Sequence, residues 1–372
     1  PRCAAQCRTM GESVNPLADL RYAATVPRIP EHAEPPNGRL ADRLGRPLRD
    51  LRISVTDRCN FRCTYCMPEE GMTWQPRDEL LTFEEIERVA RVLVERHGFE
   101  SIRLTGGEPT VRAHLPVLVA KLAALGPSGP TERGTGVDLA LTTNGATLAA
   151  MAHDLVDAGL RRINISIDSL RADRFEALTR RDELPRVLEG IDAAVAAGLD
   201  PVKLNVVMIR GVNDDEAVDF ATFGREHGVT VRFIEFMPLD AGQGWSNDQV
   251  VSQAEIVAAI DAVYPVEAVA RGSQPAERFR YLDGGGEVGV IPSVTEPFCA
   301  SCDRIRLTAD GQVRNCLFAV DELDVRAVLR SGGTDDDVSA LLQRAVGAKW
   351  AGHAIGQVHF IRPRRSMSQI GG

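Results

Sequence analysis

The sequence predicts an α/β fold, a partial (βα)6 TIM-like barrel followed by a smaller C-terminal α+β unit that carries a second cysteine cluster. Three observations lead to this prediction. Short apolar runs alternate with amphipathic segments from residue 51 onward, the alternation stops after Pro238, and each part contains its own group of cysteines. Repeated β-α units imply a parallel sheet with right-handed crossovers. Six units, rather than eight, indicate an open barrel whose chemistry lies at the carboxyl ends of the strands.

The strands expected in the barrel are short and apolar. They cover residues 51–55, 101–104, 138–141, 161–167, 202–208 and 229–236. Between them, segments 83–95, 115–124, 148–158, 184–197 and 216–227 show the apolar spacing of helices. Thr82 followed by Glu85 is the capping box that begins the first of these helices.

Four segments follow along the chain. Residues 1–47 contain scattered Pro, Gly and charge without a sustained period, so we expect a mobile N-terminal leader in which Cys3 and Cys7 are free thiols. Residues 48–240 form the barrel. Residues 241–348 form the C-terminal unit, with helices near 255–263, 325–330 and 338–348 and strands around 278–282 and 288–291. Residues 349–372 are a basic tail that ends in Gly371 and Gly372.

The composition narrows the possible partners and location. The net charge of −9 and the pI near 5.4 argue against broad electrostatic binding to nucleic acid or to an anionic membrane. No run of about 18 apolar residues could span a bilayer, and the N-terminus has no apolar signal region. We therefore expect a cytoplasmic protein with neither nucleic acid nor membrane as a partner. In a reducing compartment, clustered cysteines favour metal ligation over disulfide bonds.

The first cysteine cluster is Cys59, Cys63 and Cys66, spaced C-x3-C-x2-C directly after an expected strand. Three thiolates within one loop can hold a [4Fe–4S] cluster and leave its fourth iron without a protein ligand. The alternative is a structural zinc site. Zinc normally takes four protein ligands, and no fourth Cys or His lies nearby in the sequence. The spacing therefore favours the iron–sulfur cluster.

Other polar or small residues follow later strands. Gly106 and Gly107 permit close backbone approach, and the carboxylate of Glu108 can receive an ammonium group. Ser166 and Met237 lie at the ends of later expected strands, and Tyr65 lies between two of the cysteines. Each of these residues alone is more often an ordinary turn, cap or packing residue.

The second cysteine cluster is Cys299, Cys302 and Cys316, spaced C-x2-C-x13-C. A zinc knuckle and an iron–sulfur cluster fit this spacing about equally well. If the metal has an open site, it could bind a nucleobase nitrogen. Arg304 and Arg306 follow, and they share one face if the segment is extended.

Further cations lie within expected strands. Arg52, Arg103 and Lys203 occupy these strands, and Lys203 is one of only three lysines in the chain. Guanidinium groups suit phosphate oxygens, and several converging ones suit a triphosphate. Each cation alone is better explained as a salt-bridged residue or as a residue at the rim of the barrel. As a group, they predict an anionic substrate.

The cysteine spacing resembles that of the radical S-adenosylmethionine superfamily. Segments 51–59, 103–109, 142–145, 203–207, 233–238 and 299–306 together resemble the GTP 3′,8-cyclase family of molybdenum cofactor biosynthesis. The resemblance implies two [4Fe–4S] clusters, held by the two cysteine triplets, and S-adenosylmethionine at Tyr65, Gly107, Ser166 and Met237. It also implies GTP as the substrate, at Arg52, Arg103, Thr142 or its neighbour Thr143, Lys203, Arg304, Ile305 and Arg306, with guanine at the second cluster.

The resemblance also implies a reaction and partners. A radical would remove hydrogen from ribose C3′ of GTP, and that carbon would join guanine C8. The Gly-Gly end would reach into the active site, the enzyme would be a homodimer, and an electron donor of unknown identity would serve it. Two alternatives are a radical peptide-modifying enzyme with an auxiliary cluster and a non-catalytic zinc- or iron-binding regulator. Peptide-modifying enzymes typically have more C-terminal cysteines than the three found here.

Overall fold

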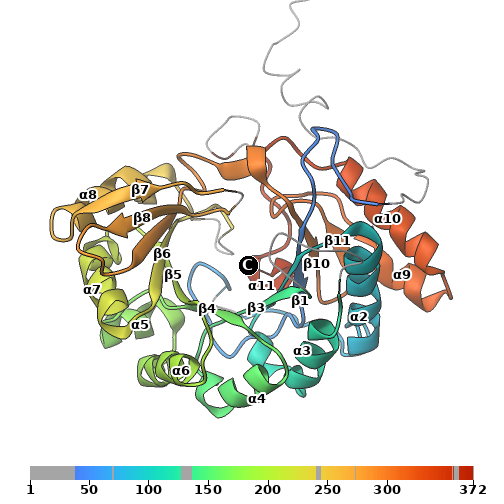
Figure 1. Cartoon of the computed structure of the whole chain (residues 1–372), viewed down its shortest axis with the longest axis horizontal. Coiled ribbons are helices and arrows are strands. Elements are labelled where there is room, and N and C mark those ends of the chain that lie inside the picture. The colour runs from blue at the N-terminus through green and yellow to red at the C-terminus, as the bar shows by residue number, and fades with distance from the viewer. Residues whose placement is uncertain are drawn as a thin grey trace, which may run out of the picture.

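The structure is a computed structural model that describes residues 38–68, 71–126, 136–239, 244–272, 274–353, 355 and 360–371. Its core is one sheet of 12 strands that curves into an incomplete ring, with helices on the outside (Figure 1). Cys3, Cys7, Gly372 and residues 1–37 of the expected leader lie outside the described residues.

Six parallel strands form the centre of the sheet. They are β1 (Asp50–Ser54), β2 (Ser101–Thr105), β3 (Asp138–Thr143), β4 (Arg162–Ser166), β5 (Val202–Met208) and β6 (Thr230–Glu235). Each pairs in parallel with the next along the chain, which confirms the expected parallel sheet of β-α units.

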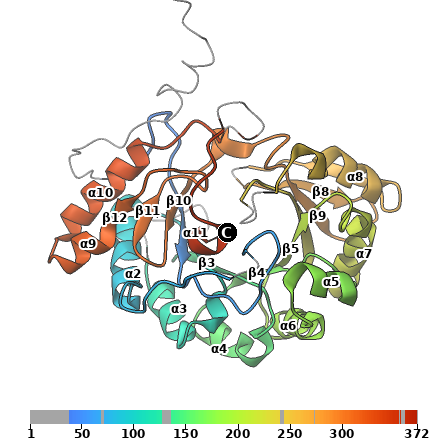
Figure 2. The same ribbon diagram turned by 180° about the vertical axis from the view of Figure 1, so that it is seen from behind.

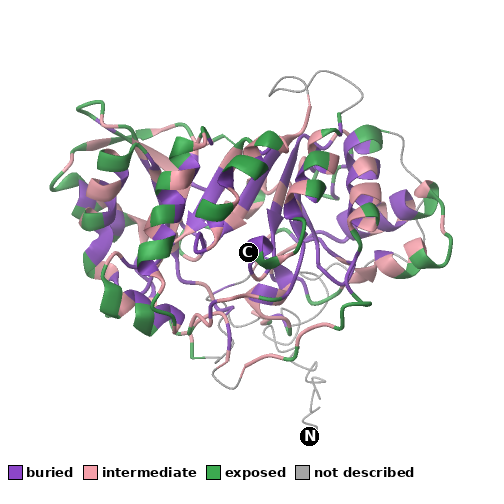
Figure 3. Cartoon of the chain, turned by 90° about the horizontal axis from the view of Figure 1, so that it is seen from below, coloured by how far each residue is buried: buried purple, intermediate pink, exposed green. Residues whose placement is uncertain are grey.

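Helices cover the outer face of these strands. They are α2 (Phe83–Arg91), continued by the π-helical turn η1 (Val92–Arg96), α3 (Leu115–Ala123), α4 (Ala152–Asp157), α5 (Ala172–Thr179), α6 (Leu184–Ala196) and α7 (Ala217–His227). The capping box of α2 is present, because Thr82 Oγ1 accepts from the Glu85 amide and Glu85 accepts from the Thr82 amide. Helix α5 was not expected from the sequence. Figure 3 shows buried strands inside and exposed residues along the outer helices.

The C-terminal unit does not form a sheet of its own but extends both edges of the barrel sheet (Figure 2). At one edge β9 (Glu287–Ile291) pairs in parallel with β6 and is followed by β8 (Glu277–Tyr281) and β7 (Val266–Val269). At the other edge β10 (Arg304–Leu307) pairs in parallel with β1 and is followed by β11 (Gln312–Arg314) and β12 (Leu323–Asp324). Edge strands present unpaired backbone groups, and these additions satisfy them.

The remaining helices complete the outside and the centre. Helices α8 (Gln253–Asp261), α9 (Val325–Arg330) and α10 (Asp335–Gly347) lie on the outside, whereas the short α11 (Met367–Ile370) lies inside the ring of strands. None of the helices in the described part of the chain is long and apolar enough to cross a membrane.

Residues 38–47, which we had assigned to the leader, are part of the fold. Leu40 is buried, and Ala41 pairs with Pro47 in an antiparallel bridge. The apolar side chain of Leu40 is covered by the main hydrophobic core. The described residues of the expected leader are therefore anchored by burial of apolar surface.

Candidate active site

A cavity of about 310 Å³ lies inside the barrel. It is lined by most of the residues that the sequence singled out, namely Arg52, Tyr65, Arg103, Thr142, Ser166, Lys203, Met237, Cys299, Cys302, Arg304, Arg306 and Cys316. The lining residues do not include Cys59, Cys63, Cys66, Gly107 or Ile305. The structure thus brings the second cysteine cluster, Tyr65 of the first cysteine loop and the expected cations to one cavity.

The first cysteine loop follows β1, and its three cysteines are free and half-buried. The amides of Cys66 and Met67 both donate to the Cys63 carbonyl, at 2.9 Å each, and so fold the loop into a turn. Burial raises the pKa of Cys59 to about 12 and that of Cys66 to about 11. Thiolates here therefore need a strong positive partner, and a metal cluster is such a partner.

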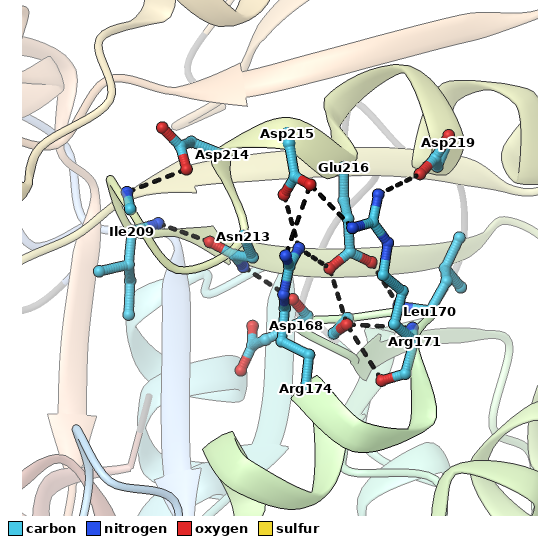
Figure 4. A network of polar contacts seen from close by, with 12 residues as sticks. Asp168, Leu170, Arg171, Arg174, Ile209, Asn213, Asp214, Asp215, Glu216 and Asp219 are labelled. Atoms are coloured by element: carbon cyan, nitrogen blue, oxygen red, sulfur yellow. Dashed lines mark hydrogen bonds and ion pairs between the residues drawn. The ribbon is translucent and has the colours of Figure 1, made fainter.

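Tyr65, between two of these cysteines, is fixed to β4 through Asp168. Its hydroxyl donates to Asp168 Oδ2 at 2.5 Å, and the Val207 amide donates to Oδ1 at 2.8 Å. Burial raises the pKa of Asp168 to about 6. Asn213 holds the carbonyl of the same aspartate at 2.7 Å, within a polar network centred on the buried carboxylate of Glu216 (Figure 4). The loop and the end of β4 are thus held together.

Gly107 is where the backbone after β2 passes the cysteine loop. A Cβ at this position would lie 2.4 Å from the Arg58 carbonyl oxygen and 2.5 Å from that of Asp57. No side chain fits there without moving backbone. The structure therefore explains a glycine at Gly107 by its packing against the start of the cysteine loop.

Glu108 does not have the open carboxylate that the sequence suggested for an ammonium group. It is buried and accepts hydrogen bonds from the amide and hydroxyl of Thr110, the hydroxyl of Thr143 and the amide of Asn144. Thr143 is therefore committed to Glu108, at 2.6 Å. Thr142 is the threonine that lines the cavity, with Asn164 Nδ2 donating to its Oγ1 at 3.2 Å.

The second cysteine cluster lies next to β10 and β11, because Cys302 comes shortly before β10 and Cys316 shortly after β11. Cys299, Cys302 and Cys316 are free. Burial acts to raise the pKa of Cys302, but the cations of Arg304 and Lys349 outweigh it and lower that pKa to about 6. Arg304 also donates to the Cys302 sulfur at 3.3 Å. This environment favours a thiolate, the form that ligates metal.

Cys59, Cys63 and Cys66 supply three free thiol groups to the first cluster, and Cys299, Cys302 and Cys316 supply three to the second. Across the described residues no three His, Cys, Asp or Glu side chains are placed to hold a single metal ion. A zinc knuckle gathers several such side chains round one ion. In a [4Fe–4S] cluster each thiolate binds a different iron, and three thiolates leave one iron open. The donor set of each triplet fits such a cluster.

Three arginines stand side by side in the cavity because of strand register. Arg306 of β10, Arg52 of β1 and Arg103 of β2 are direct partners across the sheet. No hydrogen bond or ion pair from a described residue reaches Arg52 or Arg103, and the Nε atom of each is buried and unsatisfied. Burial lowers the pKa of both, and neighbouring arginines add to the effect. The carboxylate of Asp50, which also lines the cavity, offsets part of this positive charge, and an anion bound in the cavity would offset more of it.

The cavity is positive although the chain is acidic. Among its lining residues are nine Arg and Lys side chains but four Asp and Glu side chains. Burial, followed by repulsion from Arg232, lowers the pKa of Lys203 to about 8. Arg232 is a further cation of this cavity that was not expected from the sequence. Its Nη2 donates to two neutral acceptors, Asn164 Oδ1 at 2.6 Å and Asn205 Oδ1 at 2.7 Å. Its position as a lone arginine in an apolar strand was the same signal that identified Arg52.

Ile305 and the C-terminal tail are the last two of the expected site features. Ile305 packs in the hydrophobic core on the other face of β10, so only its backbone could meet a ligand. The tail enters the barrel, where Arg306 Nη1 donates to the Gly371 carbonyl at 2.9 Å and Met367 lines the cavity. The expected Gly-Gly end thus reaches the site with its described residue, Gly371.

Comparisons with known proteins decide the family. Residues 53–224 match the model of the radical SAM superfamily, and residues 229–355 match that of Molybdenum Cofactor Synthesis C. A GTP 3′,8-cyclase of Streptomyces coelicolor is 48% identical over 336 residues, which is 90% of this chain and 96% of that protein. The chain belongs to the GTP 3′,8-cyclase family. A family member from Mycolicibacterium smegmatis is 46% identical, over 91% of this chain and 93% of that protein.

Solved structures support the fold of this GTP 3′,8-cyclase family member. SuiB of Streptococcus suis superposes with a TM-score of 0.55 at 12% identity, over 75% of this chain and 63% of that one. The chain thus covers less than two thirds of SuiB. A structure of anSMEcpe with bound AdoMet superposes with a TM-score of 0.53 at 17% identity, over 79% of each chain. At these identities the likeness is one of fold.

Proposed function

We propose that this chain converts GTP into (8S)-3′,8-cyclo-7,8-dihydroguanosine 5′-triphosphate, a radical SAM lyase reaction of molybdenum cofactor biosynthesis. One observation carries the proposal. A single cavity is lined by Tyr65, Ser166 and Met237 from the side of the first cysteine loop, by the second cysteine triplet, and by cations without a protein partner. Family membership at 43–48% identity to curated GTP 3′,8-cyclases supports the same reaction.

The first cysteine loop would hold a [4Fe–4S] cluster through Cys59, Cys63 and Cys66. S-Adenosylmethionine would lie beside it, against Tyr65, Gly107, Ser166 and Met237. When bound, these two groups supply the one-electron chemistry that removes a hydrogen atom from carbon. The protein fixes the loop through the hydrogen bond between Tyr65 and Asp168. It also brings the backbone close at Gly107, where a side chain would collide.

The cations of the cavity would hold the triphosphate. Arg52, Arg103 and Arg306 offer neighbouring guanidinium forks, and Lys203 and Arg232 face the same space from β5 and β6. Thr142, Arg304 and the backbone of Ile305 would add contacts. Guanine would meet the second cluster, held by Cys299, Cys302 and Cys316. Charge-assisted hydrogen bonds from several directions would orient the bound GTP as well as strengthen its binding.

Orientation is the main contribution of the protein to this reaction. Of the C–H bonds in the ribose, the one at C3′ has to face the cofactor, and guanine C8 has to lie close to C3′. The product has the composition of GTP, because one electron and one proton replace the hydrogen atom that C3′ loses. Anchoring the triphosphate at one end and guanine at the other would restrict the nucleotide to this pose.

The remaining assignments rest on the family resemblance. We infer a cytoplasmic homodimer that takes its electrons from a separate electron donor. The barrel would span residues 48–240, and the part that binds the second cluster would span residues 241–348. Residues 38–47 contact both parts, because His97 Nδ1 donates to the Gly38 carbonyl and Arg46 Nη1 donates to the Cys299 carbonyl. The tail beyond residue 348 is bonded to the second part, because Lys349 donates to the Arg304 carbonyl and Arg306 donates to the Gly371 carbonyl.

Anaerobic reconstitution followed by incubation with GTP, S-adenosylmethionine and dithionite tests the proposal. We expect about eight irons per chain, as two [4Fe–4S] clusters require, together with GTP-dependent release of 5′-deoxyadenosine and a cyclised nucleotide. The variant C316A should retain one cluster and lose the cyclised product. Zinc in place of iron, without cofactor cleavage, would instead indicate a regulator. Cleavage that depends on a peptide and not on GTP would indicate a peptide-modifying enzyme.

A further inference from the structure

The beginning of the C-terminal tail, residues 349–353, lies against the second cysteine triplet. We had assigned these residues to a basic tail, but Lys349 and Trp350 are buried, and Lys349 and His353 line the cavity. Their contacts reach segments that are far apart in the sequence. Each of the three cysteine segments is held by this stretch, directly or through one further residue.

Lys349 holds two of these segments. Its Nζ donates to the Asn315 carbonyl at 2.6 Å and to the Arg304 carbonyl at 2.8 Å. Asn315 directly precedes Cys316, and Arg304 is two residues beyond Cys302. The side chain is 3% exposed. A buried ammonium group with two carbonyl acceptors therefore joins the Cys302 segment to the Cys316 segment.

Arg46 holds the third segment. Its Nη1 donates to the Cys299 carbonyl at 2.5 Å and to the Ala351 carbonyl at 3.1 Å, and its Nη2 donates to the Trp350 carbonyl. Asp42 fixes the guanidinium by an ion pair with Nε at 2.5 Å. Arg46 thus links Cys299 to the residues that follow Lys349.

The tail also passes very close to the sulfur of Cys299. A Cβ on Gly352 would lie 3.2 Å from the Cys299 Cβ, which is closer than most side chains approach, and 3.5 Å from its Sγ, which is an ordinary van der Waals contact. Residues 349–353 therefore contact the three cysteine segments with backbone atoms as well as with side chains.

We propose that Lys349 and Arg46 are positioning residues that hold the three cysteine segments in place for the second [4Fe–4S] cluster. The inference rests on the second cluster of the proposed function. Hydrogen bonds that orient the backbone around metal ligands commonly govern metal retention. Removing either cation would free one of the cysteine segments, so the cluster should be lost while the first cluster remains.

The test uses K349M, R46M and the matched control K121M in the full chain. Lys121 lies on α3, where it pairs with Glu87 at 2.8 Å outside the barrel. C316A and C66A, each lacking one proposed ligand, identify the spectral signals of the two clusters. After anaerobic reconstitution, iron per chain is measured and the reduced proteins are compared by electron paramagnetic resonance.

We expect K349M and R46M to lose about half of the iron and the signal missing from C316A, but to keep the signal missing from C66A. K121M should match the wild type. A general folding defect would affect both signals, so the split distinguishes positioning from instability. R46M decides the question if K349M does not accumulate as a folded protein. Full iron and both signals in R46M and K349M would overturn the inference. A wild type with only one cluster would refute the second cluster itself.

Discussion

Replacing Arg103 by glutamine should weaken GTP binding without destabilising the GTP-free protein. Arg103 has no partner among the described residues, its Nε is buried and unsatisfied, and Arg52 stands beside it in register. A hydrogen bond to a charged group contributes about 1.5–3 kcal/mol. Loss of one guanidinium–phosphate contact should therefore raise the Kd for GTP about 10- to 100-fold. Removal of an unpaired cation should leave the free energy of unfolding unchanged or increase it.

Arg162 provides the matched control, two strands away and lining the same cavity. It is paired with Asp138 by hydrogen bonds of 2.6 and 2.5 Å. R162Q breaks this two-point pair, so it should lower the free energy of unfolding by about 1–3 kcal/mol. Calorimetric titration with GTP and urea unfolding of the GTP-free proteins measure the two effects. The reasoning fails if R103Q destabilises the protein as much as R162Q, or if it binds GTP like the wild type.

Three further predictions concern other parts of the site. G107A should prevent formation of the first cluster, measured as lost iron and lost cleavage of S-adenosylmethionine, because its Cβ would collide with backbone oxygens at 2.4 and 2.5 Å. Lys203 has a pKa of about 8 in the folded protein, below its unfolded value of about 10.4, so the unfolded state binds more protons between these values. The GTP-free stability should therefore rise with pH over this window while GTP affinity falls, and both trends should vanish in K203R. T143A should lower stability by about 1–3 kcal/mol through the lost bond to Glu108, whereas T142A should mainly raise the Kd for GTP. Equal effects of the two threonine variants on GTP binding would contradict this last assignment.

The sequence predicted the barrel because its strands are local features. Runs such as 202–208 are apolar, short and bounded by turns, and the structure has a strand at each of the six expected places. Helix α5 was missed because its segment, ADRFEALT, is only 8 residues long and buries only Phe175, Leu178 and Thr179. The strands added at the two edges depend on pairing with β1 and β6. No local pattern shows which edge a strand will join.

The candidate site residues that could be predicted from the sequence are those with a distinctive spacing or an unusual residue type for their segment. The two cysteine triplets, Arg52, Arg103 and Lys203 carry such signals, because thiolate spacing and a cation in an apolar strand are visible in the sequence. The hydrogen bonds that Glu108 accepts from Thr143 and Asn144 form between the ends of two separate strands, β2 and β3. The bonds from Arg46 to the Cys299 carbonyl and from Lys349 to the Arg304 carbonyl span 253 and 45 residues. Such distant contacts become visible only in the folded chain.

The most direct measurement of the central claim follows one hydrogen atom. GTP carrying deuterium at C3′ is incubated with the reconstituted protein, S-adenosylmethionine and dithionite, and the 5′-deoxyadenosine formed is analysed by mass spectrometry. If the cavity presents C3′ to the cofactor, this product gains one deuterium and the cyclised nucleotide lacks it. If 5′-deoxyadenosine forms without deuterium while the nucleotide keeps its label, the cavity does not hold GTP in the proposed pose.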